Sequence, residues 1–396
     1  MKFRLKKIFT IFLLFLCFVS TSIHIILPYE GAASSNQAIK NIAIILDSSE
    51  FYDSHFINDV LNGFDLVNQT YNINYTLFQL TNYSRSPITY YYNNSMTNLS
   101  QMVEMINLTE QYDLIVFMGY ELRRTPLDHS EFPTTKFLYY DISAEKPNRF
   151  PKKPEDFPEN VALVSFNESH SGFIAGTLAA KSISPQPKKI AMVCTYRNSW
   201  PSDIDHKSDP RTWQLIAGFQ SGFLRNTTEV ELSIVYIDYF WESWTNSKKA
   251  KELAEELDKQ DFDLIFSPLQ NNNTLGILEG FTKPVVTVDS NRSAIDKTVR
   301  SVVKNNTKAI LTIFEKFNQS EDNFPGIHTL GLEENVFYPS GWGNVTSIMD
   351  QIYTDVVISN IVIPTDMKHA ENTPGFEVFA LLSIILYVPL KKKRKK

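Results

Sequence analysis

The sequence contains little cysteine, and its few histidines are scattered, which excludes several classes of protein. Its 396 residues include two cysteines, so a disulfide-rich scaffold is ruled out. Cys17 lies in an apolar N-terminal run, whereas Cys194 lies in the apolar stretch 190–194, which predicts a buried core thiol. The seven histidines form no cluster with cysteine, and the chain lacks Gly-x-Ser-x-Gly, His-Glu-x-x-His and phosphate-loop motifs. We therefore expect no metal site, no cofactor and no enzymatic activity.

Positive charge is scarce in the middle of the chain. The formal net charge is −6, from 38 Lys and Arg against 44 Asp and Glu. Ten of the basic residues lie in the two terminal segments, which hold only Glu30 and Glu377 as acids, so the remainder has 28 basic and 42 acidic residues and a net charge of −14. Such a surface repels a phosphate backbone. We expect no nucleic-acid partner.

Both ends of the chain are apolar and carry basic flanks. Residues 1–33 begin with four basic residues and continue into an apolar run, which predicts a signal peptide or an N-terminal anchor. Residues 372–396 contain Pro374-Gly375-Phe376, an apolar stretch and six terminal basic residues, which predicts a sorting signal or a membrane anchor. This tail resembles the PGF-type C-terminal sorting signals of archaeal surface proteins, with an ordinary tail helix as the alternative. We expect the protein at the extracellular face of the cell membrane.

Asparagine occurs often in the acceptor pattern for N-glycosylation. Thirteen Asn-x-Ser/Thr sequons are present, and they are dense between residues 68 and 107. A single match has little meaning, but this density favours a glycosylated surface, and glycosylation of this kind requires export.

Between the ends, short runs of β-branched and aromatic residues alternate with longer amphipathic stretches. This pattern predicts parallel strands joined by helices, and two groups of such units predict two α/β lobes. Residues 83–96 and 196–211 are predicted to be irregular surface loops. The predicted strands are 41–46, 74–79, 114–118, 136–140, 162–166, 189–194, 231–237, 264–267, 285–288 and 299–303. The predicted helices are 53–68, 169–182, 213–224, 247–259 and 305–317.

One sequence block gives the chain a family resemblance. Residues 166–176 read FNESHSGFIAG, with a phenylalanine, an acidic position and an aromatic-aliphatic-Ala-Gly ending. With supporting blocks in matching order, the chain between Ala43 and Gly331 resembles the basic membrane protein family of ABC-transporter substrate-binding proteins, which includes purine nucleoside receptors. The supporting blocks are 47–64, 218–222, 286–290, 301–304 and 329–332.

The resemblance implies a fold and a domain arrangement. It implies a type I periplasmic-binding-protein fold, in which two Rossmann-like lobes hold a ligand cleft at the hinge and close around the ligand. Lobe 1 is expected at 38–187 plus 301–325, and lobe 2 at 188–300 plus 326–366.

The resemblance also assigns ligand contacts to charged residues. Asp47 follows the first predicted strand and corresponds to a polar contact, with a solvated turn residue as the alternative. Asp289 matches an aspartate that binds ribose hydroxyls, since a carboxylate can accept from two adjacent hydroxyls; a capping role in its turn is the alternative. Lys304 matches a lysine at the cleft, with a plain solvated lysine as the alternative, or Arg300 or Lys297 in its place.

Aromatic and amide side chains complete the expected site. Phe56 matches the aromatic residue that stacks on a purine, with a core residue as the alternative. Trp213 could supply the opposing aromatic face, and Tyr120 a further wall, with core packing as the alternative for Tyr120. Asn271 lies in an asparagine-rich turn where the family has Gly-Gly-Thr-Gly, and a glycosylated turn is the alternative there. Ile57 departs from the family, because the nucleoside receptors carry at this position an asparagine that hydrogen-bonds the base.

These residues predict a membrane-tethered extracytoplasmic solute-binding protein. Its expected ligand is a small polar molecule such as a nucleoside, its expected partner is an ABC permease, and we expect a monomer. A ligand-sensing surface ectodomain is the alternative. A surface nucleoside or glycoside hydrolase built on Asp47 and Asp53 is a further alternative, since glycoside hydrolysis needs two carboxyl groups at a defined separation.

Overall fold

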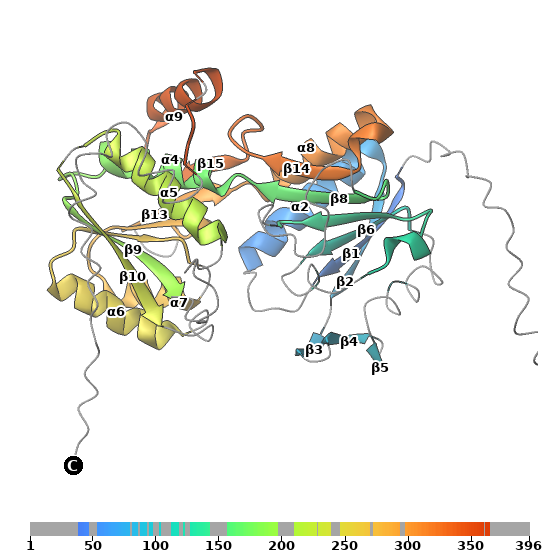
Figure 1. Cartoon of the computed structure of the whole chain (residues 1–396), viewed down its shortest axis with the longest axis horizontal. Coiled ribbons are helices and arrows are strands. Elements are labelled where there is room, and N and C mark those ends of the chain that lie inside the picture. The colour runs from blue at the N-terminus through green and yellow to red at the C-terminus, as the bar shows by residue number, and fades with distance from the viewer. Residues whose placement is uncertain are drawn as a thin grey trace, which may run out of the picture. The chain divides into compact units, whose positions relative to one another are not determined.

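Two six-stranded sheets dominate the protein (Figure 1). The computed structural model describes most of residues 39–364, and its longest gaps are 47–53, 104–111, 143–156, 197–209 and 239–245. The predicted α/β fold with two lobes is confirmed. The predicted terminal segments, 1–33 and 372–396, lie outside the described residues. In the part of the chain that is described, no helix has both the length and the apolar character needed to span a membrane.

All neighbouring strands of the first sheet run parallel. Helix α2 (Ser54–Tyr71) follows β1, and it packs on α8 (Asn306–Gln319). Parallel strands need crossover connections, so their carboxyl ends gather at one edge of the sheet. The strand order is β14 (Gly326–Leu330), β8 (Val161–Phe166), β7 (Lys136–Tyr140), β6 (Leu114–Met118), β1 (Asn41–Leu46) and β2 (Asn74–Gln79).

The second sheet is also parallel, except that its last strand is antiparallel to β13. Its order is β10 (Glu231–Asp238), β9 (Lys189–Tyr196), β11 (Leu264–Ser267), β12 (Val285–Asp289), β13 (Val299–Lys304) and β15 (Phe337–Ser340). Its helices are α4 (Glu168–Ser182), α5 (Pro210–Leu224), α6 (Ser247–Lys259), α7 (Asn272–Gly280) and α9 (Thr346–Tyr353).

Strand side chains alternate between two apolar clusters, because successive residues of a strand point to opposite faces of the sheet. In β1, Ile42, Ile44 and Leu46 belong to one cluster, whereas Ala43 and Ile45 belong to a second. Both faces of the strand are buried, as expected for a parallel sheet covered on both sides.

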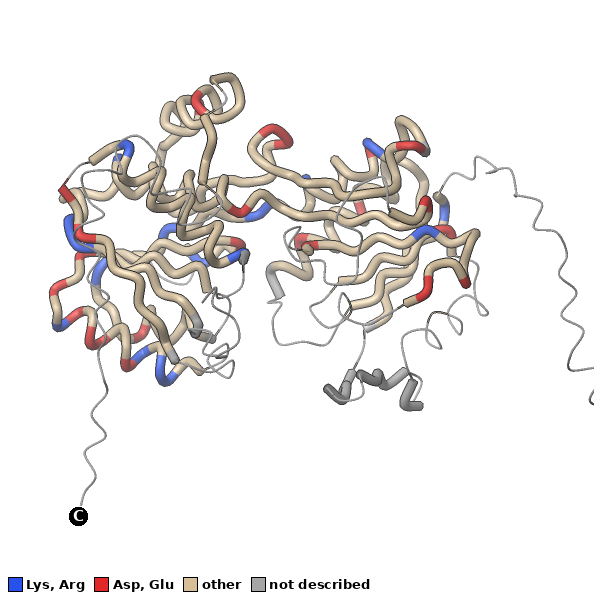
Figure 2. The backbone as a smooth tube through the Cα atoms, viewed as in Figure 1, with Lys and Arg blue, Asp and Glu red and all other residues tan. Residues whose placement is uncertain are grey.

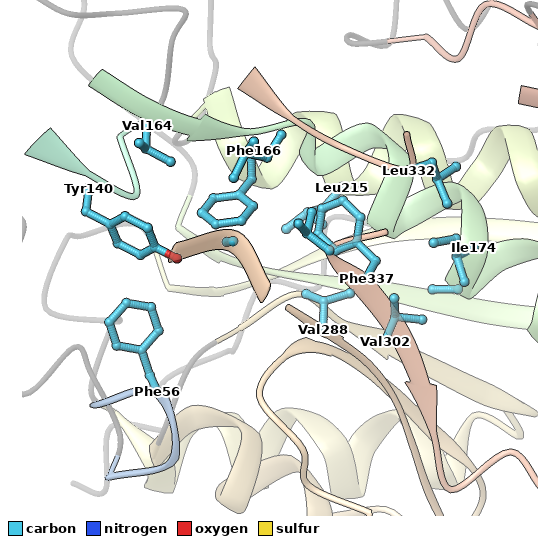
Figure 3. Close-up of a cluster of buried hydrophobic side chains, with 14 of the residues drawn as sticks. Phe56, Tyr140, Val164, Phe166, Ile174, Leu215, Val288, Val302, Leu332 and Phe337 are labelled. Atoms are coloured by element: carbon cyan, nitrogen blue, oxygen red, sulfur yellow. The ribbon is translucent and has the colours of Figure 1, made fainter. Parts of the chain in front are cut away.

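The larger cluster draws side chains from both sheets. Val164 comes from the first sheet, and Val288 and Val302 come from the second (Figure 3). Cys194 of β9 belongs to the same cluster, has no exposed surface, and burial raises the pKa of its thiol. The prediction of a buried core thiol is therefore confirmed.

Helices α4 and α5 approach each other closely through glycines. A Cβ added to Gly172 or Gly176 of α4 would overlap the backbone of α5, and one added to Gly218 or Gly222 of α5 would overlap the backbone of α4. Helix α4 also packs on β12 and β13. The small residues of the predicted helix 169–182 thus let it pack closely on a second helix as well as on a sheet.

Helix α6 shows the pattern of a surface helix. Its buried residues are Ala250, Ala254 and Leu257, one turn apart, and most of its other residues are charged (Figure 2). The apolar stripe is what holds this helix to its sheet.

In the described residues the chain passes between the two sheets three times, after β8, after β13 and after β14. Helix α4 follows β8 and packs with α5; helix α8 follows β13 and packs with α2; strand β15 follows β14 and pairs with β13. These crossing points differ from the predicted lobe boundaries at 187, 300 and 325. Strand pairing puts β13 in the second sheet and β14 in the first, whereas the predicted boundaries assign residues 301–304 to lobe 1 and residues 326–330 to lobe 2.

A third, small sheet falls where an irregular loop was expected. Strands β3 (Thr81–Arg85), β4 (Ile88–Tyr92) and β5 (Ser95–Thr97) pair in antiparallel order. The prediction of an irregular segment at 83–96 is therefore wrong. Its tyrosine, threonine and isoleucine residues favour strands, and short connections suit hairpins. The other expected loop, 196–211, lies mostly outside the described residues.

Candidate functional site

Five charged side chains meet at the carboxyl ends of strands from both sheets. Asp141 directly follows β7, and Glu168 opens α4 two residues after β8. Asp289 ends β12, Lys304 ends β13, and Arg211 lies in the first turn of α5. We call these five residues the charge cluster. Its three carboxylates and two cations give a net charge of −1 when all five are ionised.

Lys304 is the most deeply buried member of the charge cluster. Its side chain is 1% exposed, and its Nζ lies 2.9 Å from Asp141 Oδ1, 3.0 Å from Glu168 Oε1 and 3.6 Å from Asp289 Oδ1. The ammonium also sits 4.2 Å from the centroid of the Phe166 ring. Burial lowers the pKa of Lys304 and so does Arg211, but the three carboxylates outweigh them and raise the pKa above its usual value. Lys304 therefore stays charged and holds the three carboxylates together.

Arg211 contacts the same three carboxylates as Lys304. Its Nε lies 2.9 Å from Glu168 Oε1, its Nη1 3.4 Å from Asp141 Oδ2, and its Nη2 2.7 Å from Asp289 Oδ2. A planar guanidinium suits such divided contacts, because it has five donors in a fixed geometry. Its side chain is 17% exposed, so Arg211 is the more accessible of the two cations.

Glu168 is a buried acid of the charge cluster with a raised pKa. Burial raises its pKa to about 7, opposed by Arg211 and Lys304 and assisted by Asp289 and Asp141. Its Oε1 accepts a hydrogen bond from Lys304 Nζ and forms an ion pair with Arg211, whereas its Oε2 is buried with no hydrogen-bond partner among the described residues. A buried carboxylate oxygen without a donor favours the protonated form of the acid.

Two of the carboxylate residues have an unusual backbone conformation. Asp141 has φ +59° and Asp289 has φ +72°, and this left-handed region costs an L-residue roughly 1–2 kcal/mol. Aspartate tolerates it better than most residues, because its short side chain bonds locally. The same backbone conformation recurs at the ends of β7 and β12, one in each sheet.

The predicted charged contacts Asp289 and Lys304 lie together in the charge cluster, and Asp47 lies outside the described residues. The expectation that Lys304 could be a plain solvated lysine is wrong, because its ammonium is buried among carboxylates. Tyr120 and Asn271 also lie outside the described residues.

The predicted aromatic contacts lie in helices. Phe56, in α2, is buried at the edge of the large apolar cluster, where Figure 3 shows its ring below that of Tyr140. The Tyr140 hydroxyl donates to Asn306 Oδ1 at 2.9 Å, which ties β7 to the start of α8. Trp213, in α5, is half-buried, and its Nε1 is buried without a hydrogen-bond partner among the described residues.

Asp141, Glu168 and Arg211 were not predicted as site residues. Asp141 follows a buried strand directly, which is the same pattern that identified Asp47 and Asp289. Glu168 lies inside the block at 166–176. Arg211 had no comparable pattern, because it ends a segment that reads as an irregular loop.

A family model and several solved structures resemble this chain. The model described as Bmp, ABC transporter substrate-binding protein PnrA-like, matches residues 39–340. Comparison with curated protein sequences gives no match. An ABC transporter solute-binding protein from Aeropyrum pernix is 16% identical with a TM-score of 0.56, over 84% of this chain and 95% of that one.

Two further structures share the fold at 14% identity. One is an ABC transporter solute-binding protein from Conexibacter woesei, with a TM-score of 0.58 over 82% of this chain and 99% of that one. The other is a transcriptional activator of the comK gene from Bacillus halodurans, with a TM-score of 0.56 over 81% of this chain and 98% of that one. At these identities the likeness concerns the fold.

Proposed function

Because the chain belongs to the Bmp family of PnrA-like ABC transporter substrate-binding proteins, we propose that it captures a nucleoside and passes it to an ABC permease. The family acts outside the cytoplasm as the binding component of importers, and its members are binding proteins rather than enzymes. The two apolar ends of this chain would tether it to the membrane, and we propose that it works as a monomer.

The observation that carries the proposal is the charge cluster at the carboxyl ends of strands from both sheets. Ligands of open α/β sheets bind at this edge. Asp289, which corresponds to the family's ribose-binding aspartate, lies in the cluster. Three carboxylates face two cations, so no cation is left over for a phosphate group. The cluster therefore suits an uncharged ligand with hydroxyl donors, such as a nucleoside, better than a nucleotide.

The two cations receive different roles in this proposal. Lys304 is too deeply buried to reach a ligand, so it positions the carboxylates. Arg211 is accessible and contacts the ligand together with Asp289. Phe56 and Trp213 supply aromatic faces, and Asp47, Tyr120 and Asn271, which lie outside the described residues, are further proposed ligand contacts.

Titration of the purified protein tests this proposal. Isothermal calorimetry with adenosine, guanosine, inosine and uridine should show binding of at least one nucleoside, and its 5′-monophosphate should bind at least tenfold more weakly. Glucose, ribose and a set of amino acids serve as comparison ligands. Binding of a sugar or an amino acid without binding of any nucleoside would contradict the nucleoside assignment.

A matched pair of variants tests the site. Asp289→Asn keeps the shape of the side chain and removes its charge, so it should weaken nucleoside binding at least tenfold, since hydrogen bonds to charged groups are worth about 1.5–3 kcal/mol. Asp350→Asn makes the same change on the exposed side of α9 and should leave affinity unchanged. Equal affinities for both variants would show that Asp289 lies outside the ligand site.

A sensing role is the second candidate. The transcriptional activator from Bacillus halodurans shares the fold, so the fold is compatible with functions other than import. In that case the ligand would bind in the same place, but the bound protein would signal through a partner. Cross-linking in native membranes separates the two functions, because importer function requires a permease among the cross-linked partners.

A further inference from the structure

Sequons are about three times as frequent in this chain as its composition predicts. The sequence has 30 asparagines, and 62 of its 396 residues are serine or threonine, so chance would give about five sequons. It has thirteen. The excess cannot be explained by an asparagine-rich composition, because the composition is already included in the comparison.

Some sequons in the described residues have their amide nitrogen engaged inside the fold. Asn226 Nδ2 donates to Gly222 O at 2.8 Å, and Asn68 Nδ2 lies 3.4 Å from Asn74 Oδ1. Asn167 lies against the ring of His170 at the first crossing between the sheets, and its Oδ1 accepts from the hydroxyl of Ser169, which completes its sequon and is buried. These three asparagines are half-buried. A glycan on any of them would disrupt contacts that the fold uses.

Two other sequons are fixed through their hydroxyl residue. Thr307, which completes the sequon of Asn305, bonds through its hydroxyl to the carboxylate of Asp59 at 2.7 Å. Ser293, which completes the sequon of Asn291, bonds to Asn291 and to Ser340. Both asparagines are half-buried. An enzyme that transfers an oligosaccharide to a sequon must recognise its hydroxyl group. In both of these sequons the hydroxyl is already hydrogen-bonded within the fold.

The remaining sequons with described side chains are open, because both of their residues are exposed. The contacts that two of them make, from Asn68 Nδ2 to Asn74 Oδ1 and from Asp322 N to Ser320 Oγ, use acceptor atoms and leave the asparagine nitrogen and the hydroxyl proton free. Asn74, Asn318 and Asn344 are exposed, and so are the hydroxyl residues that complete them, Thr76, Ser320 and Thr346. Asn344 Oδ1 accepts from Thr346 N at 3.3 Å, a bond that holds the sequon in a turn and leaves its Nδ2 unused.

We propose that Asn74, Asn318 and Asn344 are N-glycosylation sites and that Asn68, Asn167, Asn226, Asn291 and Asn305 are not. A membrane transferase would use a lipid-phosphate-linked oligosaccharide as the donor. A bond forms between the anomeric carbon of the sugar and Asn Nδ2, while the bond between that carbon and the phosphate oxygen breaks. The lipid phosphate leaves with the electron pair, and the amide nitrogen loses one proton. This inference needs only the extracytoplasmic location of the family.

Open and engaged sequons lie at different edges of the sheets. Asn74 is the first residue of β2, so it lies at the edge of the first sheet opposite to the carboxyl ends that carry Asp141. The engaged sequons at Asn167, Asn291 and Asn305 follow β8, β12 and β13, at the same edges as the charge cluster. Glycans at the three open positions would therefore coat the protein and leave the proposed ligand site uncovered.

Peptide mass spectrometry of the protein purified from its native cells tests this inference. Peptides that contain Asn74, Asn318 and Asn344 should carry saccharide masses, and those that contain Asn167, Asn226 and Asn305 should have their unmodified mass. Unmodified peptides at all three open positions would overturn the proposal. Saccharide on Asn167 or Asn226 would overturn the inference that sequons engaged inside the fold stay unmodified.

Single substitutions in the native host give an independent readout. Thr76→Val, Ser320→Ala and Thr346→Val keep each asparagine but remove its sequon, so each should lower the intact mass by one glycan. Ser182→Ala, which removes an exposed hydroxyl outside any sequon, is the control and should cause no glycan loss. Nucleoside titration of the same preparations is read separately, so a failure of the binding proposal and a failure of the glycan proposal are distinguishable.

Discussion

Arg211 Nη2 lies 2.7 Å from Asp289 Oδ2, so one oxygen of the proposed ribose-binding carboxylate already carries a guanidinium. Lys304 lies 3.6 Å from the other oxygen. Hydroxyl groups of a ligand must therefore share Asp289 with Arg211 or replace it there. If the hydroxyl groups share Asp289, the ligand binds to a pair of opposite charges, and the guanidinium contributes to specificity.

Arg211→Gln should weaken nucleoside binding by about 10-fold or more, because a charged donor beside Asp289 is lost. The cluster would then carry a net charge of −2, and the pKa of Glu168 should rise further. The pH dependence of nucleoside affinity between pH 6 and pH 9 should therefore differ between the variant and the wild type, and calorimetry across this range measures it. A purely structural role for Arg211 would lower the melting temperature without altering the pH profile. Lys251→Gln, which removes an exposed ion pair with Glu279, is the matched control.

Glu168→Gln should remove one component of the pH dependence of stability. The pKa of Glu168 in the folded protein is about 7, above its usual 4.5, so the folded state holds the proton more tightly than the unfolded state. This group alone makes stability fall as pH rises from about 4.5 to about 7, by on the order of 3 kcal/mol. The neighbouring charges that act on it, Asp141, Asp289, Arg211 and Lys304, remain in the variant. Urea unfolding at pH 4.5 and pH 7.5 measures the difference, and parallel profiles for the two proteins would contradict it.

His170→Asn should also change the pH dependence of stability. The contribution of His170 to stability falls as pH decreases, whereas that of Glu168 falls as pH increases. Burial lowers the pKa of His170 to about 4, opposed by the charge of Glu334. Its neutral Nδ1 accepts from Leu332 N at 3.2 Å, which joins α4 to the crossing after β14. This stability is present above pH 6.5 and is lost as pH falls towards 4, on the order of 3 kcal/mol. Asparagine can keep a neutral acceptor there, so the variant should lose less stability than the wild type between pH 6.5 and 4.5. A steeper loss in the variant would contradict this role.

Gly176→Ala should destabilise the protein by about 3 kcal/mol or more, because the new methyl group would overlap the carbonyl oxygen of Phe219 in α5. Thermal unfolding followed by circular dichroism measures the effect, and soluble yield replaces it if the variant does not fold. Ser182→Ala, at the exposed end of the same helix, should change stability by no more than about 0.5 kcal/mol. Equal melting temperatures for the two variants would show that α4 and α5 can separate at little cost.

The sequence was most informative where one physical pattern determined the local structure. The predicted strands 41–46, 74–79 and 264–267 match the observed ones residue for residue, because each is an apolar or β-branched run between polar turns. Helix 247–259 also matches, since its alanines and leucine recur at helical spacing. These are local properties that a single segment carries by itself.

Pairing between distant segments was less predictable. Strands β14 and β15 were not predicted, because Gly326 and Pro339 weaken the strand pattern and both strands are held by partners far along the chain. The cluster was only partly foreseen for the same reason. Asp289 and Lys304 follow family blocks, but the contact between Arg211 and Asp141 joins residues 70 positions apart, and no local pattern encodes it.

The three crossings have a consequence for how the protein is made. The first sheet is completed only by β14, which ends at Leu330, and the second only by β15, which ends at Ser340. Neither lobe corresponds to one continuous stretch of chain that could fold ahead of the other during synthesis. Both sheets reach their full set of strands within the same ten residues, so the two lobes are completed together during synthesis.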